Sequence, residues 1–315
     1  MRRDQRLVLL GSGLLVVGLL ASCQAAQSSG PKHQTTKTVT VKKVSSSVTT
    51  PTRPQLPFKQ LVAKTLGPIK GQSAVAIQTT TGQTYYWHNR QQKAASVIKL
   101  FILATVYQQV VDKTLRLDTT YTLKARDKVG GTGNLQAQAV GTPVTYRALV
   151  KAMMTVSDNT ATNILIRAVG GRTVVNREIA RLGATKTRLN RLMMDQTALA
   201  AGRDNVTSVG DLSRVLMRLW HHRLISPAAD TAMLNLMAAN TNHQKLPRLV
   251  SSQLKVYNKT GEFDTYGVEN DAAILAKGRR AIVVVALSQG GTLAQQLPAM
   301  NQLGHQVTTT YFHKE

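Results

Sequence analysis

Residues 96–111 have the sequence SVIKLFILATVYQQVV, a long apolar stretch that begins with serine and carries a lysine three residues later. This composition predicts a buried helix from Ser96 to Val111. Residues three apart share one face of a helix, so the Lys99 amine is expected beside the Ser96 hydroxyl. A serine hydroxyl is a weak nucleophile that needs a neighbouring base. The stretch therefore predicts a central helix and a candidate nucleophile with its base.

The position of Lys99 in the first turn of this helix suits a base. Burial and the positive end of the helix dipole both disfavour an ammonium ion, so both lower the pKa of a lysine there. The backbone N–H of Ser96 is also free at that end and can help to stabilise an oxyanion. The alternative interpretation is a helix-capping serine followed by a surface lysine.

The pattern Ser-x-x-Lys alone identifies nothing, because it occurs at Ser29–Lys32, Ser96–Lys99 and Ser252–Lys255. The first copy lies in a polar segment near the N-terminus. The third precedes a predicted strand, in which positions three apart face opposite sides. Only the copy at Ser96 opens a helix.

Two further motifs, Ser157-Asp158-Asn159 and Lys259-Thr260-Gly261, follow Ser96 at separations of 61 and 163 residues. The first lies in a break between two predicted helices, and the second ends a β-rich run. Separately they are typical of a helix cap and of a strand leading into a turn. Together, in this order and spacing, the three motifs resemble those of class A β-lactamases and penicillin-binding proteins.

The resemblance implies a catalytic role for four side chains. Ser96 would attack the substrate carbonyl, and Lys99 would take its proton. Ser157 would relay a proton to the leaving nitrogen, while Lys259 would supply positive charge. Acyl transfer needs this combination of nucleophile, base, proton relay and anion donor.

The resemblance also implies the residues that bind substrate. Asn159 would hold a substrate amide, and Thr260 would bind the substrate carboxylate. The backbone N–H of Glu262, directly after Gly261, would complete the oxyanion hole with that of Ser96. No cofactor or metal is required, and the histidines lack a metal-ligand spacing.

The chain departs from the family in the loop expected to carry a deacylating glutamate. Arg191 and Asp204 resemble the ion pair that closes the neck of this loop, but the glutamate position falls on Met193. Methionine cannot activate water, so deacylation is expected to be slow. Asp195 is the nearest substitute, but its side chain is shorter and lies two positions further on, so a solvated loop aspartate is the favoured interpretation. The family's helper asparagine falls near Thr197.

A second departure concerns an arginine that binds the substrate carboxylate in some family members. Glu269 stands at that position in this chain. Recognition of a substrate carboxylate is then expected to rest on Lys259 and Thr260.

The resemblance implies an α+β fold, β-lactamase/transpeptidase-like, with an antiparallel sheet flanked by helices and an all-helical insertion. The residue pattern predicts matching elements. Helices are expected over 58–66, 96–111, 145–156, 160–169, 173–182, 208–222, 227–239 and 292–307, and strands over 73–79, 83–88, 254–259, 268–277 and 280–288.

The N-terminal segment predicts export and anchoring. Three arginines and an apolar run precede Leu-Ala-Ser-Cys23, which is typical of a lipoprotein signal peptide over 1–23 with lipidation of Cys23. An uncleaved anchor, or an ordinary signal with an incidental cysteine, is the alternative. Residues 24–57, rich in Ser, Thr and Lys, predict a disordered tether, and 58–315 the catalytic domain. We therefore expect the protein at the extracellular face of a bacterial membrane.

The net charge of +25 indicates which partners the protein is expected to have. It favours an anionic membrane and cell-wall polymers, whereas the export signal excludes nucleic acid. The motifs leave three candidate functions. The first is hydrolysis of β-lactams. The second is a penicillin-binding D-alanyl peptidase acting on peptidoglycan stem peptides, and the third a non-catalytic wall-binding lipoprotein.

Overall fold

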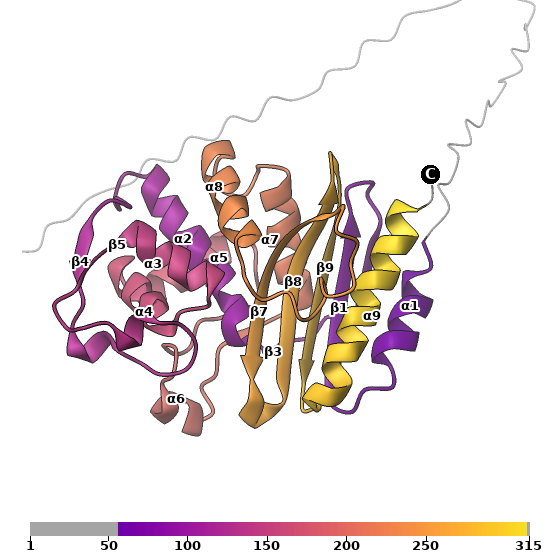
Figure 1. Cartoon of the computed structure of the whole chain (residues 1–315), viewed down its shortest axis with the longest axis horizontal. Helices are drawn as coiled ribbons and strands as arrows, with labels where there is room; N and C mark the ends of the chain where they lie inside the picture. The colour runs from indigo at the N-terminus through magenta and orange to yellow at the C-terminus, as the bar shows by residue number, and fades with distance from the viewer. Residues whose placement is uncertain (1–55, 314–315) are drawn as a thin grey trace, which may run out of the picture. The chain divides into compact units, whose positions relative to one another are not determined.

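The computed structural model describes residues 56–313, and a five-stranded antiparallel sheet organises them (Figure 1). Its order is β2-β1-β9-β8-β7, which leaves β7 at one edge. The strands are β1 (Gln72–Thr79), β2 (Thr84–Trp87), β7 (Lys255–Phe263), β8 (Val268–Lys277) and β9 (Arg280–Gln289). Both faces of β8 and β9 are buried, which explains the apolar runs at 272–276 in β8 and 281–287 in β9.

Two layers of helices cover the sheet. Helices α1 (Phe58–Leu66) and α9 (Leu293–Phe312) pack together on one face, and α7 (Val209–Trp220) packs on the other. Strand β1 serves both layers, because side chains alternate between faces along a strand. Val75 and Ile77 join the core under α1 and α9, whereas Ala74 and Ala76 join the larger core on the opposite side.

The helical part is built around α2 (Lys99–Val111), in which every residue from Lys99 to Tyr107 is buried. A helix that is apolar all round must lie inside a protein, which explains the composition of this stretch. The neighbouring helices lie to one side of the sheet in Figure 1. They are α3 (Tyr146–Thr155), α4 (Asn159–Ala168), α5 (Arg172–Arg181), α6 (Gln196–Ala200) and α8 (Pro227–Ala238).

The expected α+β fold is confirmed, with differences in individual elements. The last helix, expected to end at 307, continues to Phe312, and the short helix α6 was not predicted. The segment at Ser96 begins with a 3₁₀ turn, η1 (Ala95–Ile98), and β7 continues through Lys259 to Phe263. Pairs of strands too short to show an alternating pattern were not predicted. They are β3 (Gln92–Lys93) with β6 (Val206–Thr207) and β4 (Thr120–Thr122) with β5 (Pro143–Thr145). Short 3₁₀ turns complete the chain: η2 (Ala125–Asp127), η3 (Leu135–Ala137) and η4 (Asp264–Tyr266).

The predictions for the signal peptide, for Cys23 and for the tether up to residue 55 lie outside the described residues. Within residues 56–313, no helix combines the length and the apolar character needed to cross a bilayer.

Candidate active site

Ser96 lies on the turn η1, between the helical part and the edge strand β7. The residue before it, Ala95, has a φ of 42°, a left-handed conformation that costs energy for any residue except glycine. The Asn270 side chain holds the approach to this turn by donating to the carbonyl oxygens of Lys93 at 2.9 Å and Ala94 at 3.1 Å. The sheet thus fixes the backbone that presents Ser96.

Gly261 brings β7 directly against this turn. A Cβ atom at position 261 would lie 2.9 Å from the backbone nitrogen of Ser96 and 3.0 Å from that of Val97. Backbone atoms cannot yield as a side chain can, so a side chain here would push β7 away from Ser96. The glycine of the Lys-Thr-Gly motif is therefore required by close packing.

Lys99 is fully buried, and its Nζ atom faces the junction between α3 and α4. It lies 2.7 Å from the Ser157 carbonyl oxygen, 3.0 Å from Ser157 Oγ and 2.9 Å from Asn159 Oδ1. Burial, and secondarily the charge of Lys259, hold the pKa of Lys99 well below its ordinary value. The expected direct contact with the Ser96 hydroxyl is not among these bonds, because three oxygens at the junction satisfy the buried amine better than one hydroxyl.

Ser157 links the two lysines of the site. Its φ of 56° is left-handed, and its Oγ atom lies 3.0 Å from Lys99 Nζ and 3.1 Å from Lys259 Nζ. Lys259 is also fully buried, and burial lowers its pKa to about 8. The next residue, Asp158, caps α4 by accepting from the Ala161 N–H at 2.8 Å. One hydroxyl therefore lies between two amines whose pKa values are both depressed.

Asn159 joins this network to a glycine-rich loop. Its side-chain oxygen accepts from Lys99, and its Nδ2 donates to the Gly130 carbonyl oxygen at 3.1 Å. Its predicted role toward a substrate amide would require this loop contact to be shared or exchanged.

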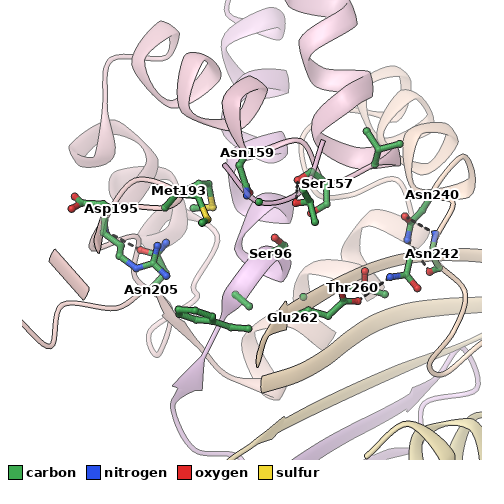
Figure 2. Close-up of a pocket in the computed structure, with 18 of the residues that line it drawn as sticks. Ser96, Ser157, Asn159, Met193, Asp195, Asn205, Asn240, Asn242, Thr260 and Glu262 are labelled. Atoms are coloured by element: carbon green, nitrogen blue, oxygen red, sulfur yellow. Dashed lines mark hydrogen bonds between the residues drawn. The ribbon is translucent and has the colours of Figure 1, made fainter. Parts of the chain in front are cut away.

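A cavity of about 350 Å³ opens at Ser96 (Figure 2). In the figure, Ser96 lies between Ser157 and Asn159 on the helical side and Thr260 and Glu262 on β7. The predicted residues that line the cavity are Ser96, Ser157, Asn159, Met193, Asp195, Thr260, Gly261 and Glu262. Among the described residues, no group of three or more metal-ligand side chains could hold an ion.

The loop from residue 191 to 204 closes one side of the cavity. The expected ion pair at its neck is confirmed, with Arg191 Nη2 2.8 Å from Asp204 Oδ1, and Lys93 contacts the other Asp204 oxygen at 3.2 Å. The Asn163 side chain fixes Met193 by accepting from its N–H at 2.8 Å and donating to its carbonyl oxygen at 3.0 Å. This clamp was not predicted, because asparagine in a helix gives no signal of a loop it will contact.

The side chain of Met193 is buried and lines the cavity at the position expected for a glutamate. Asp195, the nearest carboxylate on this loop, caps α6 by accepting from the Ala198 N–H at 2.9 Å. Figure 2 shows its carboxylate pointing away from Ser96. The structure therefore gives Asp195 a capping role rather than that of a base.

A polar cluster at the far end of the cavity was also missed by sequence reasoning. Asn240 and Asn242 line the cavity, and Asn242 Nδ2 donates to Glu262 Oε1 at 2.9 Å. Behind them, Lys245 is buried against the carboxylates of Glu262 and Glu269. These residues lie in the connection before β7, whose sequence shows no periodicity.

Sequence comparisons agree with this geometry. The family profile described as the beta-lactamase enzyme family matches residues 57–311. Beta-lactamase ROB-1 of Haemophilus influenzae is 26% identical over 265 residues, covering 82% of this chain and 85% of the relative. A beta-lactamase of Streptomyces fradiae is 29% identical over 223 residues, covering 68% and 72%.

Solved structures extend the comparison to the fold. A beta-lactamase from Sphaerobacter thermophilus superimposes with a TM-score of 0.76 at 27% identity, covering 81% of this chain and 97% of that one. A variant of PBP-A, solved as an acyl-enzyme complex with penicillin G, gives 0.74 at 20% identity, with coverage of 81% and 95%. The chain therefore belongs to the beta-lactamase enzyme family, as a class A β-lactamase/transpeptidase-like serine hydrolase.

Proposed function

We propose that the protein forms an acyl-enzyme at Ser96 with β-lactams and releases the acyl group slowly. The observation that carries this proposal is the position of Ser157, which lines the Ser96 cavity and whose Oγ lies between the buried amines of Lys99 and Lys259. The protein of known structure that was captured with penicillin G has the same fold, which supports the choice of substrate class.

In the proposed acylation, Ser96 Oγ attacks the lactam carbonyl carbon and its proton passes to Lys99. A depressed pKa keeps a share of Lys99 in the neutral form that accepts the proton. Ser157 then delivers its proton to the lactam nitrogen as the C–N bond breaks, and takes in exchange the proton held by Lys99, whose Nζ lies 3.0 Å from its Oγ. Lys259 lies against the same hydroxyl. Ser96 is left as an ester, and the former lactam nitrogen as an amine.

The carbonyl oxygen becomes negative during attack and needs donors. The N–H groups of Ser96 and Glu262 are assigned this role, because Gly261 packs directly against the Ser96 nitrogen. Such donors are typically worth about 3 kcal/mol or more of transition-state stabilisation each.

Deacylation is the step for which the site is poorly equipped. Water must attack the ester, and a base must take its proton. Met193 occupies the wall where that base is expected, and Asp195 is committed to capping α6. We therefore infer that acylation is faster than release.

The same asymmetry supports a second candidate, a penicillin-binding D-alanyl-D-alanine peptidase acting on stem peptides. Its acylation chemistry is identical, and an amine acceptor could replace water. The third candidate, a non-catalytic wall-binding lipoprotein, has no physical reason to keep two buried lysines against Ser157, since unpaired buried amines are costly.

Location is proposed from the sequence alone. A lipid on Cys23 would hold the protein at the extracellular face of the membrane, and the charge of +25 would strengthen contact with anionic lipid and wall polymers.

A fluorescent penicillin tests the proposed function. We expect the purified protein to retain covalent label after denaturation, while Ser96→Ala retains none, and we expect little turnover of nitrocefin. Equal labelling of the Ser96→Ala variant would refute the nucleophile. Rapid nitrocefin turnover would refute slow release and point to another base.

A further inference from the structure

A carboxylate stands in the wall of the cavity beside Thr260. Glu262 lines the cavity, and its side chain is 39% exposed. Residues two apart on a strand project from the same face, so the side chains of Thr260 and Glu262 are neighbours on β7. Figure 2 shows both on the side of the cavity below Ser96. Any substrate group bound at Thr260 is therefore adjacent to Glu262.

The cation behind this carboxylate has no free donor. Lys245 is buried, with Nζ 2.6 Å from a Glu269 oxygen and 3.0 Å from a Glu262 oxygen. It also donates to the carbonyl oxygens of Gly261 and Asn270, each at 3.2 Å. An ammonium group carries three N–H donors, and four acceptors already surround it. Lys245 therefore cannot act as the anchor for a substrate carboxylate.

Glu262 itself is held in its ionised form. Burial raises its pKa, but the charge of Lys245 and the hydrogen bonds from Lys245 and Asn242 outweigh burial, so the pKa lies below its ordinary value. Both of these contacts go to Oε1. The second oxygen, Oε2, keeps its capacity to accept from a ligand in the cavity.

Two further cations lie near the cavity, and both are engaged. Arg191 lines the cavity but is paired with Asp204 at 2.8 Å. Lys259, the residue before Thr260, is buried. Its Nζ donates to Ser157 Oγ at 3.1 Å and to the Thr260 carbonyl oxygen at 2.9 Å. A carboxylate entering here meets cations that already have partners, and the more exposed charge of Glu262. An amide or ammonium group meets an acceptor in Glu262, and bonds to an ionised acceptor are the stronger kind.

We propose that Glu262 selects acyl donors whose group beside Thr260 is an amide or an ammonium rather than a carboxylate. The inference rests on the proposed function, because it concerns the substrate presented to Ser96. Penicillins carry a carboxylate at this end, so they acylate Ser96 below the rate that the site supports for an amide. Glu262 acts in binding, while its backbone N–H serves the oxyanion.

Rates of Ser96 acylation by benzylpenicillin and by its carboxamide test the proposal. In the wild-type full chain, the carboxamide is expected to react faster. Glu262→Gln keeps the backbone N–H and leaves Lys245 paired with Glu269, so the variant is expected to fold. It should raise the benzylpenicillin rate by roughly tenfold, as expected for removal of one partly screened charge, and lower the carboxamide rate, because the amide loses its ionised acceptor.

Asp264→Asn is the matched control, because it removes the same charge from the exposed turn η4 outside the cavity. It should change either rate by less than about twofold. An unchanged benzylpenicillin rate in Glu262→Gln, an equal rise for both reagents, or a faster wild-type reaction with benzylpenicillin would each overturn the charge preference. Absence of acylation by both reagents in every variant would instead overturn the proposed function, and this inference with it.

Discussion

Replacement of Met193 by glutamate tests the origin of slow release most sharply. The Asn163 clamp fixes the backbone of residue 193 through bonds of 2.8 and 3.0 Å, so the new side chain should start from the same position. Methionine and glutamate are both long and unbranched, so the carboxylate should reach the cavity wall that the thioether now lines. Burial there would raise its pKa and make it a better base.

The expected gain follows from the contribution of a positioned general base. Such a base is worth roughly 100- to 10,000-fold in rate, or about 3 to 5 kcal/mol of barrier. We expect Met193→Glu to accelerate release of the penicilloyl group by at least roughly 100-fold. The buried carboxylate should lower the free energy of unfolding by about 1 to 3 kcal/mol, because its hydrogen bonding is incomplete.

Release is measured by acylating the protein, removing free penicillin and following loss of the adduct by mass spectrometry. Met193→Gln is the control, since it has the shape of glutamate without its basicity, and its release should match that of the wild type. Similar rates for the glutamate and glutamine variants would refute the explanation that a missing base limits release.

Three further changes probe the rest of the site. Gly261→Ala would place a Cβ atom 2.9 Å from the Ser96 nitrogen. We expect the acylation rate to fall at least roughly tenfold, and the free energy of unfolding measured in urea to fall by about 1 to 3 kcal/mol. An acylation rate equal to that of the wild type would contradict the close approach. The pKa of Lys259 is about 8, so its charge is present below that pH and lost above it, and acylation should decline above about pH 8. Lys259→Arg should move this decline to higher pH, and an unshifted decline would exclude Lys259 as its cause. Asp204→Ala would strip the buried Arg191 of its partner, with an expected loss of about 3 kcal/mol in the free energy of unfolding; a loss below about 0.5 kcal/mol would show that the neck does not depend on this pair.

The long elements could be predicted from sequence because buried helices and strands are rich in apolar residues. The stretch 100–107 is almost wholly apolar and is buried all round, and the apolar runs at 272–276 in β8 and 281–287 in β9 are buried on both faces. Their ends were less predictable. The Lys-Thr-Gly motif reads as the exit of a strand, yet β7 continues to Phe263 because β8 pairs with it over its whole length.

In the site, the residues could be predicted from sequence, but their contacts could not. Motif order and spacing predicted Ser96, Ser157 and Lys259 as site residues, and the structure brings Ser157 and Lys259 into direct contact. Local spacing suggested that Lys99 touches Ser96, but the buried amine finds its partners 58 and 60 residues away. Such contacts depend on how the α3–α4 junction meets α2, which no local pattern records.

Lys245 illustrates the same limit at the far end of the cavity. A lysine in an irregular connection is ordinarily a surface residue. Here it is buried because Glu262 and Glu269 pair across β7 and β8 and supply two carboxylates, while backbone carbonyls of the same two strands supply two more acceptors. The pairing of the two strands, rather than the sequence around Lys245, creates that environment.

We infer above all that Ser96 is acylated more readily than it is released. Intact-protein mass spectrometry after exposure to benzylpenicillin tests it directly, with wild type and Ser96→Ala compared over time. We predict a single covalent adduct on the wild type that persists after the free drug is removed, and none on the variant. An adduct of equal yield on Ser96→Ala, or a wild-type adduct that disappears as soon as the drug is removed, would contradict the account.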